Sequence, residues 1–239
     1  MRTIAFYFYF FGYLLCSIPL LNKIKKRKET TLSVEEQDRL DHVFPKKWAK
    51  TLVKISGADV TVIGEENIPA GPVLFVANHE GNFDIPILLS GLKKPFGFIS
   101  KIEVTKIPIV HKWMEVMNCV FMDRKDRRQS IKAIRQGIEV LKNGHSIVVF
   151  PEGTRSKGGP VQEFKAGSLR LGTDAHVPIV PVAIKGTSTI MEKNKGWIKP
   201  GTVTVTVLPA LTYEQNKEMD AKMMLANIED RIIEARANA

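Results

Sequence analysis

Two short segments of the chain carry side chains whose types and spacing could do chemistry together. The first, residues 78–84, reads Asn-His-Glu-Gly-Asn-Phe-Asp and places His79 five residues before Asp84. A carboxylate that binds one ring nitrogen of an imidazole keeps that nitrogen protonated and leaves the other free as a general base. The chain has no Gly-x-Ser-x-Gly elbow, so such a base would activate a substrate hydroxyl. Taken alone, Asp84 could equally cap the following helix, with His79 as an ordinary loop residue.

The second segment, residues 150–156, reads Phe-Pro-Glu-Gly-Thr-Arg-Ser. Arg155 offers a planar fork of donors that matches phosphate oxygens, and Gly153 allows the backbone to approach a ligand closely. Arg124 supplies another cation directly after an apolar run. Each of these alone could be part of a solvated turn. None of the five histidines has a second His or Cys at metal-ligand spacing, so no metal site is predicted.

The elements that must position these segments begin near residue 59. Strands are predicted at 60–63, 73–77, 96–99, 119–122, 147–150, 179–184 and 203–208, and helices near 83–91, 110–117, 127–143, 167–175 and 213–235. This alternation predicts an α/β domain with a mostly parallel sheet flanked by helices. Because the loops after parallel strands line one crevice, His79, Arg124 and Arg155 are expected to converge there.

The N-terminal run, residues 3–22, contains no charged side chain and is rich in Phe, Leu and Tyr. As a helix it would be about 30 Å long, close to the thickness of a bilayer core, although Pro19 would kink or end it. A cleaved signal peptide fits less well, because only Arg2 precedes the run and no small-x-small site follows. Five basic residues within 23–28 favour a retained helical membrane anchor, with the rest of the chain on the cytoplasmic side of the cell (inner) membrane.

Composition and charge also favour contact with a membrane surface. The 239 residues are 44% hydrophobic and 25% charged, as in a globular protein, and the net charge of +10 suits an anionic partner. Eleven Lys/Arg against five Asp/Glu fall within residues 1–58, beside the apolar run, which favours a membrane surface over nucleic acid. Residues 45–57 form a basic amphipathic pattern with Trp48 on its apolar side, typical of an interfacial helix. A surface helix packed on the domain is the alternative.

Residues 1–57 are therefore expected to anchor the chain to a membrane through the apolar helix, a basic linker and the interfacial helix. Residues 58–239 are expected to form the catalytic domain. With only two cysteines, Cys16 and Cys119, no disulfide framework is predicted.

Taken together and in this order, the segments resemble the glycerolipid acyltransferase family, and within it most closely the bacterial 1-acyl-sn-glycerol-3-phosphate acyltransferases. Four blocks carry the resemblance: NHEGNFD at 78–84, CVFMDR at 119–124, FPEGTRS at 150–156 and VPIVPVAI at 177–184. The first, an HX4D motif, and the third are the most specific. The resemblance covers about residues 58–210, and the apolar N-terminus is also similar.

The resemblance implies transfer of a fatty acyl group from a thioester of acyl carrier protein or coenzyme A to the sn-2 hydroxyl of 1-acyl-sn-glycerol 3-phosphate. The product would be phosphatidic acid, used in phospholipid biosynthesis. His79 would be the general base and Asp84 its orienting partner, while residues 177–184 would help form the acyl-donor region. No cofactor, metal or nucleic acid is implied. The acceptor would be bound by Arg124, Glu152, Gly153, Thr154 and Arg155, with Lys101 as a further candidate for phosphate contact.

Other functions stay open at this point. The same chemistry could serve another acceptor, namely glycerol 3-phosphate, a lysophospholipid or an acylated amino acid. A thioester hydrolase would not need the anion-binding candidates, and a lipid-binding protein without turnover would not need a base. Two residues after His79, Gly81 stands where the family often has a serine, and the acidic Glu80 lies directly beside the histidine.

Overall fold

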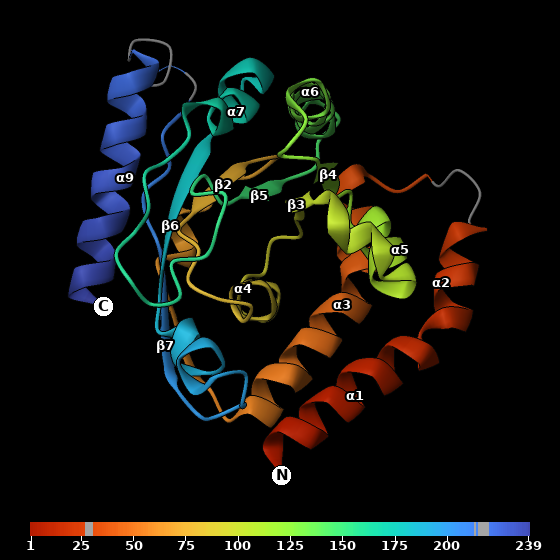
Figure 1. Ribbon diagram of the computed structural model, residues 1–239. Coiled ribbons are helices and arrows are strands. Elements are labelled where there is room, and N and C mark those ends of the chain that lie inside the picture. Colours follow the sequence, from red (N-terminus) through yellow and green to blue (C-terminus); the bar gives the residue numbers. More distant parts are fainter. Residues whose placement is uncertain (27–30, 213, 215–219) are drawn as a thin grey trace.

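The fold is built on a single seven-stranded sheet, seen in a computed structural model that describes residues 1–26, 31–212, 214 and 220–239. The strand order is β1-β7-β6-β2-β5-β3-β4 (Figure 1). β6, β2, β5, β3 and β4 run parallel, whereas β7 is antiparallel to β6 and parallel to β1. The predicted mostly parallel sheet is thus confirmed. The strands are β1 Asp59–Ile63, β2 Leu74–Ala77, β3 Gly97–Lys101, β4 Val120–Met122, β5 Ile147–Val149, β6 Ile179–Lys185 and β7 Thr202–Val207.

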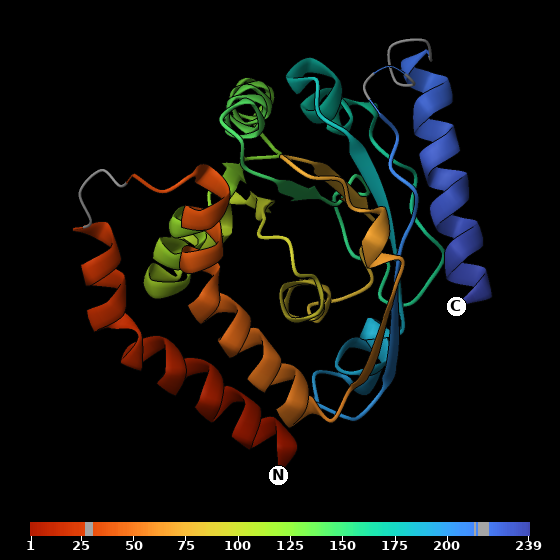
Figure 2. The same ribbon diagram turned by 180° about the vertical axis from the view of Figure 1, so that it is seen from behind.

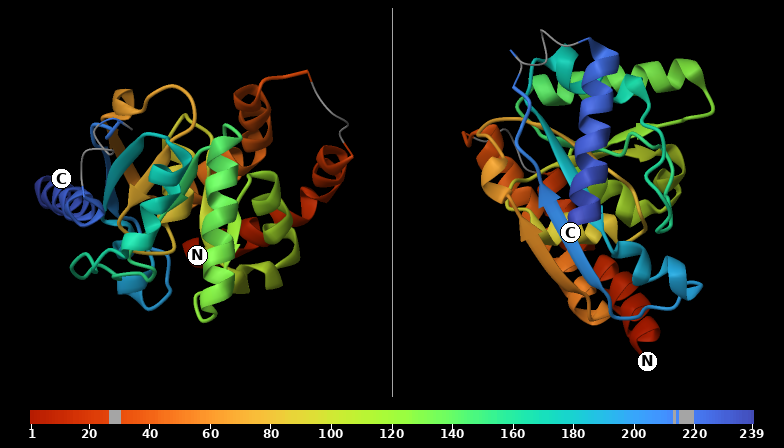
Figure 3. Two further views of the ribbon diagram at one scale, coloured as in Figure 1. Left: turned by 90° about the horizontal axis from the view of Figure 1, so that it is seen from above. Right: turned by 90° about the vertical axis from the view of Figure 1, so that its left-hand side faces the viewer.

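Helices cover both faces of the sheet (Figures 1 and 2). They are α1 Arg2–Cys16, α2 Ile18–Lys25, α3 Val34–Ser56, α4 Asp84–Gly91, α5 Pro108–Val116, α6 Arg127–Lys142, α7 Arg170–Ala175 and α9 Ala221–Asn238. Side chains of α1, α3, α4 and α5 share one core cluster with one face of the sheet, and those of α6, α7 and α9 share a second cluster with the other face. Figure 3 shows α9 running alongside the sheet. Part of the helix predicted at 213–235 lies outside the described residues.

The central strands are buried on both faces, as expected of parallel strands between helical layers. All four residues of β2 are buried, and their side chains alternate between the two clusters. The apolar segment at 177–184 is buried in the same way, between the two helical layers. Residues Ile179–Ile184 of β6 are fully buried in the sheet, so packing accounts for this apolar block.

Helix α3 begins eleven residues before the predicted interfacial helix at 45–57. Its start is set by a capping box in which the Ser33 hydroxyl accepts from the Glu36 backbone N–H and the Glu36 carboxylate accepts from the Ser33 N–H. Pro45 lies inside the helix. Ala49 and Leu52, on the apolar side, are buried in the same core cluster as the strands. This side of α3 is therefore packed against the protein, as in the alternative reading of that pattern.

The N-terminal run forms two helices that meet at Ser17. Pro19 lies in the first turn of α2, where its missing N–H breaks no helical hydrogen bond, so the break comes two residues before the expected position. Within the described residues no single helix is long and apolar enough to cross a membrane. α1 and α2 together would meet the length and composition required, but they are bent by 41°.

The bend is tied to the domain by a buried hydrogen bond. Nε1 of Trp113 on α5 donates to the Ser17 hydroxyl at 2.8 Å, and that hydroxyl donates to the Leu14 carbonyl at 2.5 Å. Ser17 and Trp113 are 0% and 4% exposed. Leu14, Leu21 and Trp113 form a small core of their own. The N-terminal helices are thus fixed to the rest of the chain at α5.

Replacing Ser17 by Ala should lower the free energy of unfolding by about 1–3 kcal/mol, because it leaves the buried Trp113 N–H without an acceptor. Urea unfolding of the full chain in detergent measures this. The double variant Ser17→Ala/Trp113→Phe removes donor and acceptor together, so its cost should be less than the sum of the single changes. Simple additivity would contradict the proposed coupling.

Candidate active site

The centre of the site is the turn that joins β2 to α4. Nδ1 of His79 lies 2.5 Å from Oδ2 of Asp84, the first residue of α4. The same oxygen accepts hydrogen bonds from the backbone N–H groups of Glu80 at 2.8 Å and Gly81 at 3.0 Å. The other oxygen accepts from the hydroxyl of Thr187, and Asp84 is fully buried. Four donors thus face one carboxylate.

This arrangement sets the orientation of the imidazole. Since Asp84 accepts from two backbone N–H groups and a hydroxyl, it acts as a carboxylate, and the ring nitrogen that faces it must carry the proton. The Nδ1–H of His79 therefore donates to Asp84, and Nε2 keeps its lone pair. Within the described residues no hydrogen bond is made by Nε2. The His79 side chain is 18% exposed, so a ligand can reach this edge of the ring.

The segment at 150–156 lies directly against the turn, as predicted for two loops at the carboxyl ends of neighbouring parallel strands. The Phe150 ring is stacked on the His79 ring, with 4.1 Å between centroids and 16° between planes. The Ser156 N–H donates to the His79 carbonyl at 2.8 Å, and the Lys157 N–H donates to the Glu80 carbonyl at 3.0 Å. The two most specific sequence blocks therefore form one unit.

Glu152 joins the two loops through backbone contacts. Its Oε1 accepts from the His79 N–H at 2.5 Å and its Oε2 from the Gln162 N–H at 2.8 Å. The side chain is buried, and burial raises the pKa of this carboxyl above its usual range. Both oxygens accept from backbone donors, so Glu152 joins the two loops. The acceptor-binding role that the family resemblance implies for Glu152 stays a prediction.

The three predicted cations, Arg155, Arg124 and Lys101, differ in how closely they lie to the His79 turn. Arg155 donates to the Asn82 side-chain oxygen and lies 3.5 Å from the Glu192 carboxylate, which also accepts the Asn82 N–H at 2.7 Å. Arg124 donates to the Gly153 carbonyl. Lys101 ends β3 in register with Met122 of β4 and is exposed.

Thr154 is also exposed. Among the residues the structure describes, no side-chain hydrogen bond joins Lys101 or Thr154 to the other candidates. The same part of the chain holds no group of three or more His, Cys, Asp or Glu side chains that could bind a metal ion.

Three contributors to the site were not predicted from the sequence. Thr187 follows β6, so the rule that loops after parallel strands converge could have found it. Glu192 holds Asn82 and Arg155 from a short 3-10 turn, and no pattern in the sequence indicates this. The third is Arg236 of α9, which is far away along the chain.

Arg236 forms an ion pair with a buried acid of the turn. Its Nε and Nη2 lie 2.8 and 2.7 Å from Oε1 of Glu80, which is 1% exposed. The Arg236 guanidinium also donates to the Gly159 carbonyl at 3.0 Å. On its other side, Oε2 of Glu80 accepts from the Gly186 N–H at 2.9 Å. Glu80 thereby links α9 and the loop after β6 to the residue that adjoins His79.

An apolar cavity of about 380 Å³ lies on the face of the sheet covered by α1, α3, α4 and α5. Asn82 and Phe83 of the β2–α4 turn are among the residues that line it. The other lining residues are mainly aromatic and aliphatic, including Trp48, Leu52, Phe98, Val104, Trp113 and Met114. The turn that carries His79 therefore also borders a space suited to a hydrocarbon chain.

A sequence profile of the family described as acyltransferase matches residues 59–185, which is more than half of the chain and includes β1–β6 and both loops of the site. The chain belongs to the acyltransferase family. The crystal structure of the 1-acyl-sn-glycerophosphate (LPA) acyltransferase PlsC from Thermotoga maritima superposes on this family member with a TM-score of 0.85, at 29% identity over 99% of this chain and 94% of the other.

Curated members of the acyltransferase family are similar in sequence. A 1-acyl-sn-glycerol-3-phosphate acyltransferase of Chlamydomonas reinhardtii is 34% identical over 91% of this chain and 65% of its own length. A probable 1-acyl-sn-glycerol-3-phosphate acyltransferase of Mycoplasma pneumoniae is 40% identical over 59% of this chain and 54% of its own length. The chain thus spans between about half and two thirds of the length of these two relatives.

Changing Arg236 to Ala should lower the free energy of unfolding by about 2–3 kcal/mol, because the Glu80 carboxylate is left buried without its counter-charge. We expect kcat to fall as well, since Glu80 adjoins His79. Urea unfolding and an acyl-transfer assay measure the two effects. The exposed Lys222→Ala on the same helix is the control. Adding Glu80→Gln to Arg236→Ala removes the unpaired charge and should recover part of the stability; a further loss would contradict this account.

Proposed function

We propose that this chain transfers a fatty acyl group from an acyl thioester to the sn-2 hydroxyl of 1-acyl-sn-glycerol 3-phosphate, giving phosphatidic acid. The observation that carries the proposal is the oriented imidazole of His79. The turn that holds this imidazole also lines an apolar cavity and accepts a hydrogen bond from Arg155. Asn82 of that turn lines the cavity and accepts a hydrogen bond from Arg155. The names of the similar proteins support the same acceptor.

In the proposed reaction, Nε2 of His79 takes the proton of the sn-2 hydroxyl as the oxygen attacks the thioester carbon. The tetrahedral intermediate collapses, the carbon–sulfur bond breaks, and the thiolate leaves. The thiolate then takes the proton from the imidazolium, so that the base is regenerated and a free thiol is released. Asp84 stabilises the imidazolium and keeps Nδ1 protonated throughout. The chemistry needs no cofactor. Its co-substrate is the acyl thioester of acyl carrier protein or of coenzyme A.

The acceptor phosphate is proposed to bind Arg155, with Arg124 and the exposed Lys101 adding positive charge at the same edge of the sheet. Thr154 and the backbone at Gly153 complete this proposed surface. The Arg155 guanidinium is 37% exposed and is held by one amide oxygen and a carboxylate 3.5 Å away, so donors remain for a phosphate.

Contact with a membrane is proposed to run through the exposed side of α1. Three side chains of α1 are exposed, namely Phe8 at 82%, Phe11 at 57% and Leu15 at 59%. Trp197, from the loop that precedes β7, is 63% exposed. These side chains line one shallow hollow together with Ile4. Aromatic and aliphatic side chains on one face of a helix suit burial at the headgroup boundary of a bilayer. The domain would lie on the cytoplasmic side of the cell membrane.

The deciding experiment is thiol release from an acyl thioester by the purified chain in detergent, with and without 1-acyl-sn-glycerol 3-phosphate. Release should depend on this acceptor and fall roughly 10²–10⁴-fold in His79→Ala, which removes the base. His111→Ala, which removes an imidazole from α5, is the matched control and should keep activity. Release without acceptor would identify a thioester hydrolase, and release with another acceptor only would refute the proposed substrate.

Arg155→Ala should raise the KM for the acceptor about ten- to a hundredfold, because a hydrogen bond to a charged group contributes about 1.5–3 kcal/mol. Lys157→Ala removes an exposed cation two residues away and should change KM little. Initial rates over a range of acceptor concentrations measure both. If the unmodified chain acylates 1-acylglycerol, which lacks the phosphate, equally well, the phosphate-binding role of Arg155 is wrong.

A further inference from the structure

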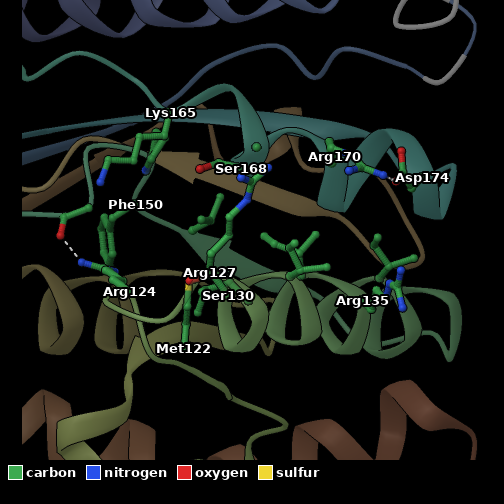
Figure 4. A pocket seen from close by; sticks show the side chains of 18 of the residues that line it. Met122, Arg124, Arg127, Ser130, Arg135, Phe150, Lys165, Ser168, Arg170 and Asp174 are labelled. Atoms are coloured by element: carbon green, nitrogen blue, oxygen red, sulfur yellow. Dashed lines mark hydrogen bonds and ion pairs between the residues drawn. The ribbon is translucent and has the colours of Figure 1, made fainter.

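A second hollow, which we call the α6–α7 groove, lies on the opposite face of the sheet from the apolar cavity. It has a volume of about 880 Å³ and runs between α6 on one side and α7 with the preceding 3-10 turn on the other. Figure 4 shows Arg124, Arg127 and Arg135 on the α6 side, facing Lys165, Ser168 and Arg170 across the groove. Arg124 and Gly153, at one end of the groove, also belong to the proposed acceptor site, but no residue of that site lies on α6 itself.

The groove is strongly cationic. Six Arg or Lys side chains line it against two acids. Arg170 is paired with Asp174 at 2.9 Å, and Lys142 is 3.9 Å from Glu139. Arg127 and Arg135 are exposed and make no ion pair within the described residues. The groove therefore keeps unneutralised positive charge along one wall, as expected of a surface that meets an anionic partner.

Its floor along α6 is apolar and partly open to solvent. Ile131, Ile134 and Ile138 lie three and four residues apart, so they form one stripe on the helix. Ile131 is 46% exposed. An isoleucine stripe bordered by cations matches the surface of an acidic helix that carries apolar residues on one side, whereas a free nucleotide would leave this stripe uncovered.

The length of the charged row also favours a protein partner. From Arg127 to Lys142 the helix rises about 22 Å. Attraction between exposed charges is screened over about 10 Å at moderate salt, so one cluster of phosphates cannot neutralise both ends of the row. An extended acidic surface of a protein can neutralise the whole row.

One end of the groove lies one side chain away from His79. Phe150 lines the groove, and its ring is the one stacked on His79 at 4.1 Å. Gly153, which also lines it, is held by Arg124. A thioester on a flexible arm bound at this end would have only the Phe150 side chain between it and His79. The apolar cavity borders the same β2–α4 turn from the other face of the sheet.

We propose that the α6–α7 groove docks an acidic acyl carrier protein, whose phosphopantetheine arm delivers the acyl thioester to His79. The proposal rests on the proposed acyl transfer and adds to it the identity and entry side of the donor. The carrier binds on the α6–α7 face, and the lipid acceptor enters from the side of α1.

The test compares two double charge reversals on α6. Arg127→Glu/Arg135→Glu changes the groove wall. Arg128→Glu/Lys132→Glu makes the same change of charge at exposed residues of the same helix that do not line the groove, and is the matched control. Binding of a fluorescently labelled holo acyl carrier protein to the full chain in detergent is measured by anisotropy. Turnover is measured with palmitoyl-carrier protein and with palmitoyl-coenzyme A.

The groove variant should bind the carrier about tenfold or more weakly at low salt, with a matching rise in KM for the carrier-borne donor only, because charge reversal at the rim of an interface weakens association. The difference should shrink at 0.5 M salt, about the range where screening becomes severe. Equal effects of both double variants would overturn the proposal, since net charge alone would explain them. An equal rise in KM for palmitoyl-coenzyme A would overturn it in favour of a small-donor site.

The outcomes also separate this proposal from the proposed function. Absence of acceptor-dependent thiol release from either donor by the unmodified chain would refute acyl transfer to 1-acyl-sn-glycerol 3-phosphate, while the anisotropy measurement still tests docking. Transfer from palmitoyl-coenzyme A by a chain that does not bind the carrier would refute docking and leave the acyl transfer standing.

Discussion

The buried carboxylate of Asp84 is the interaction on which the rest of the site depends. A charge without contact to water is costly unless every lone pair is used, and here a ring N–H, two backbone N–H groups and a hydroxyl all point at it. These donors come from the β2–α4 turn and from the loop after β6. The sheet order, which puts β6 beside β2, is therefore a requirement for the orientation of His79 and not only a scaffold around it.

Two further buried acids extend this network, and each connects a different part of the fold. Glu152 ties the loop after β5 to the backbone of His79, and Glu80 ties α9 and the loop after β6 to the same turn. Together with Asp84 they place three buried carboxyl groups around one imidazole, each held by its own hydrogen-bond donors. A rigidly held His79 ring follows from this arrangement, because moving the turn would leave several buried polar groups without partners.

The sequence predicted the strands and the parallel sheet, because apolar runs are local properties. The pairing of His79 with Asp84 followed from their spacing only together with the family resemblance. The sequence did not predict the tie from Arg236 to Glu80, since nothing in a helix of mixed charge marks one arginine for a contact 156 residues away. The basic pattern around Trp48 fits either an interfacial helix or a surface helix packed on the domain, and its apolar side packs against the core. Amphipathic periodicity gives the face of a helix and leaves open what covers that face.

The contact between α9 and the β2–α4 turn has a consequence for biosynthesis. A chain emerges from the ribosome in sequence order, and its early segments begin to fold first. The aromatic helix α1, proposed to contact lipid, is therefore made long before α9, whereas Glu80 lacks its partner Arg236 until nearly all of the described chain has been made. If α1 contacts the bilayer as proposed, that contact precedes the completion of the site, and catalytic competence is acquired at the membrane surface.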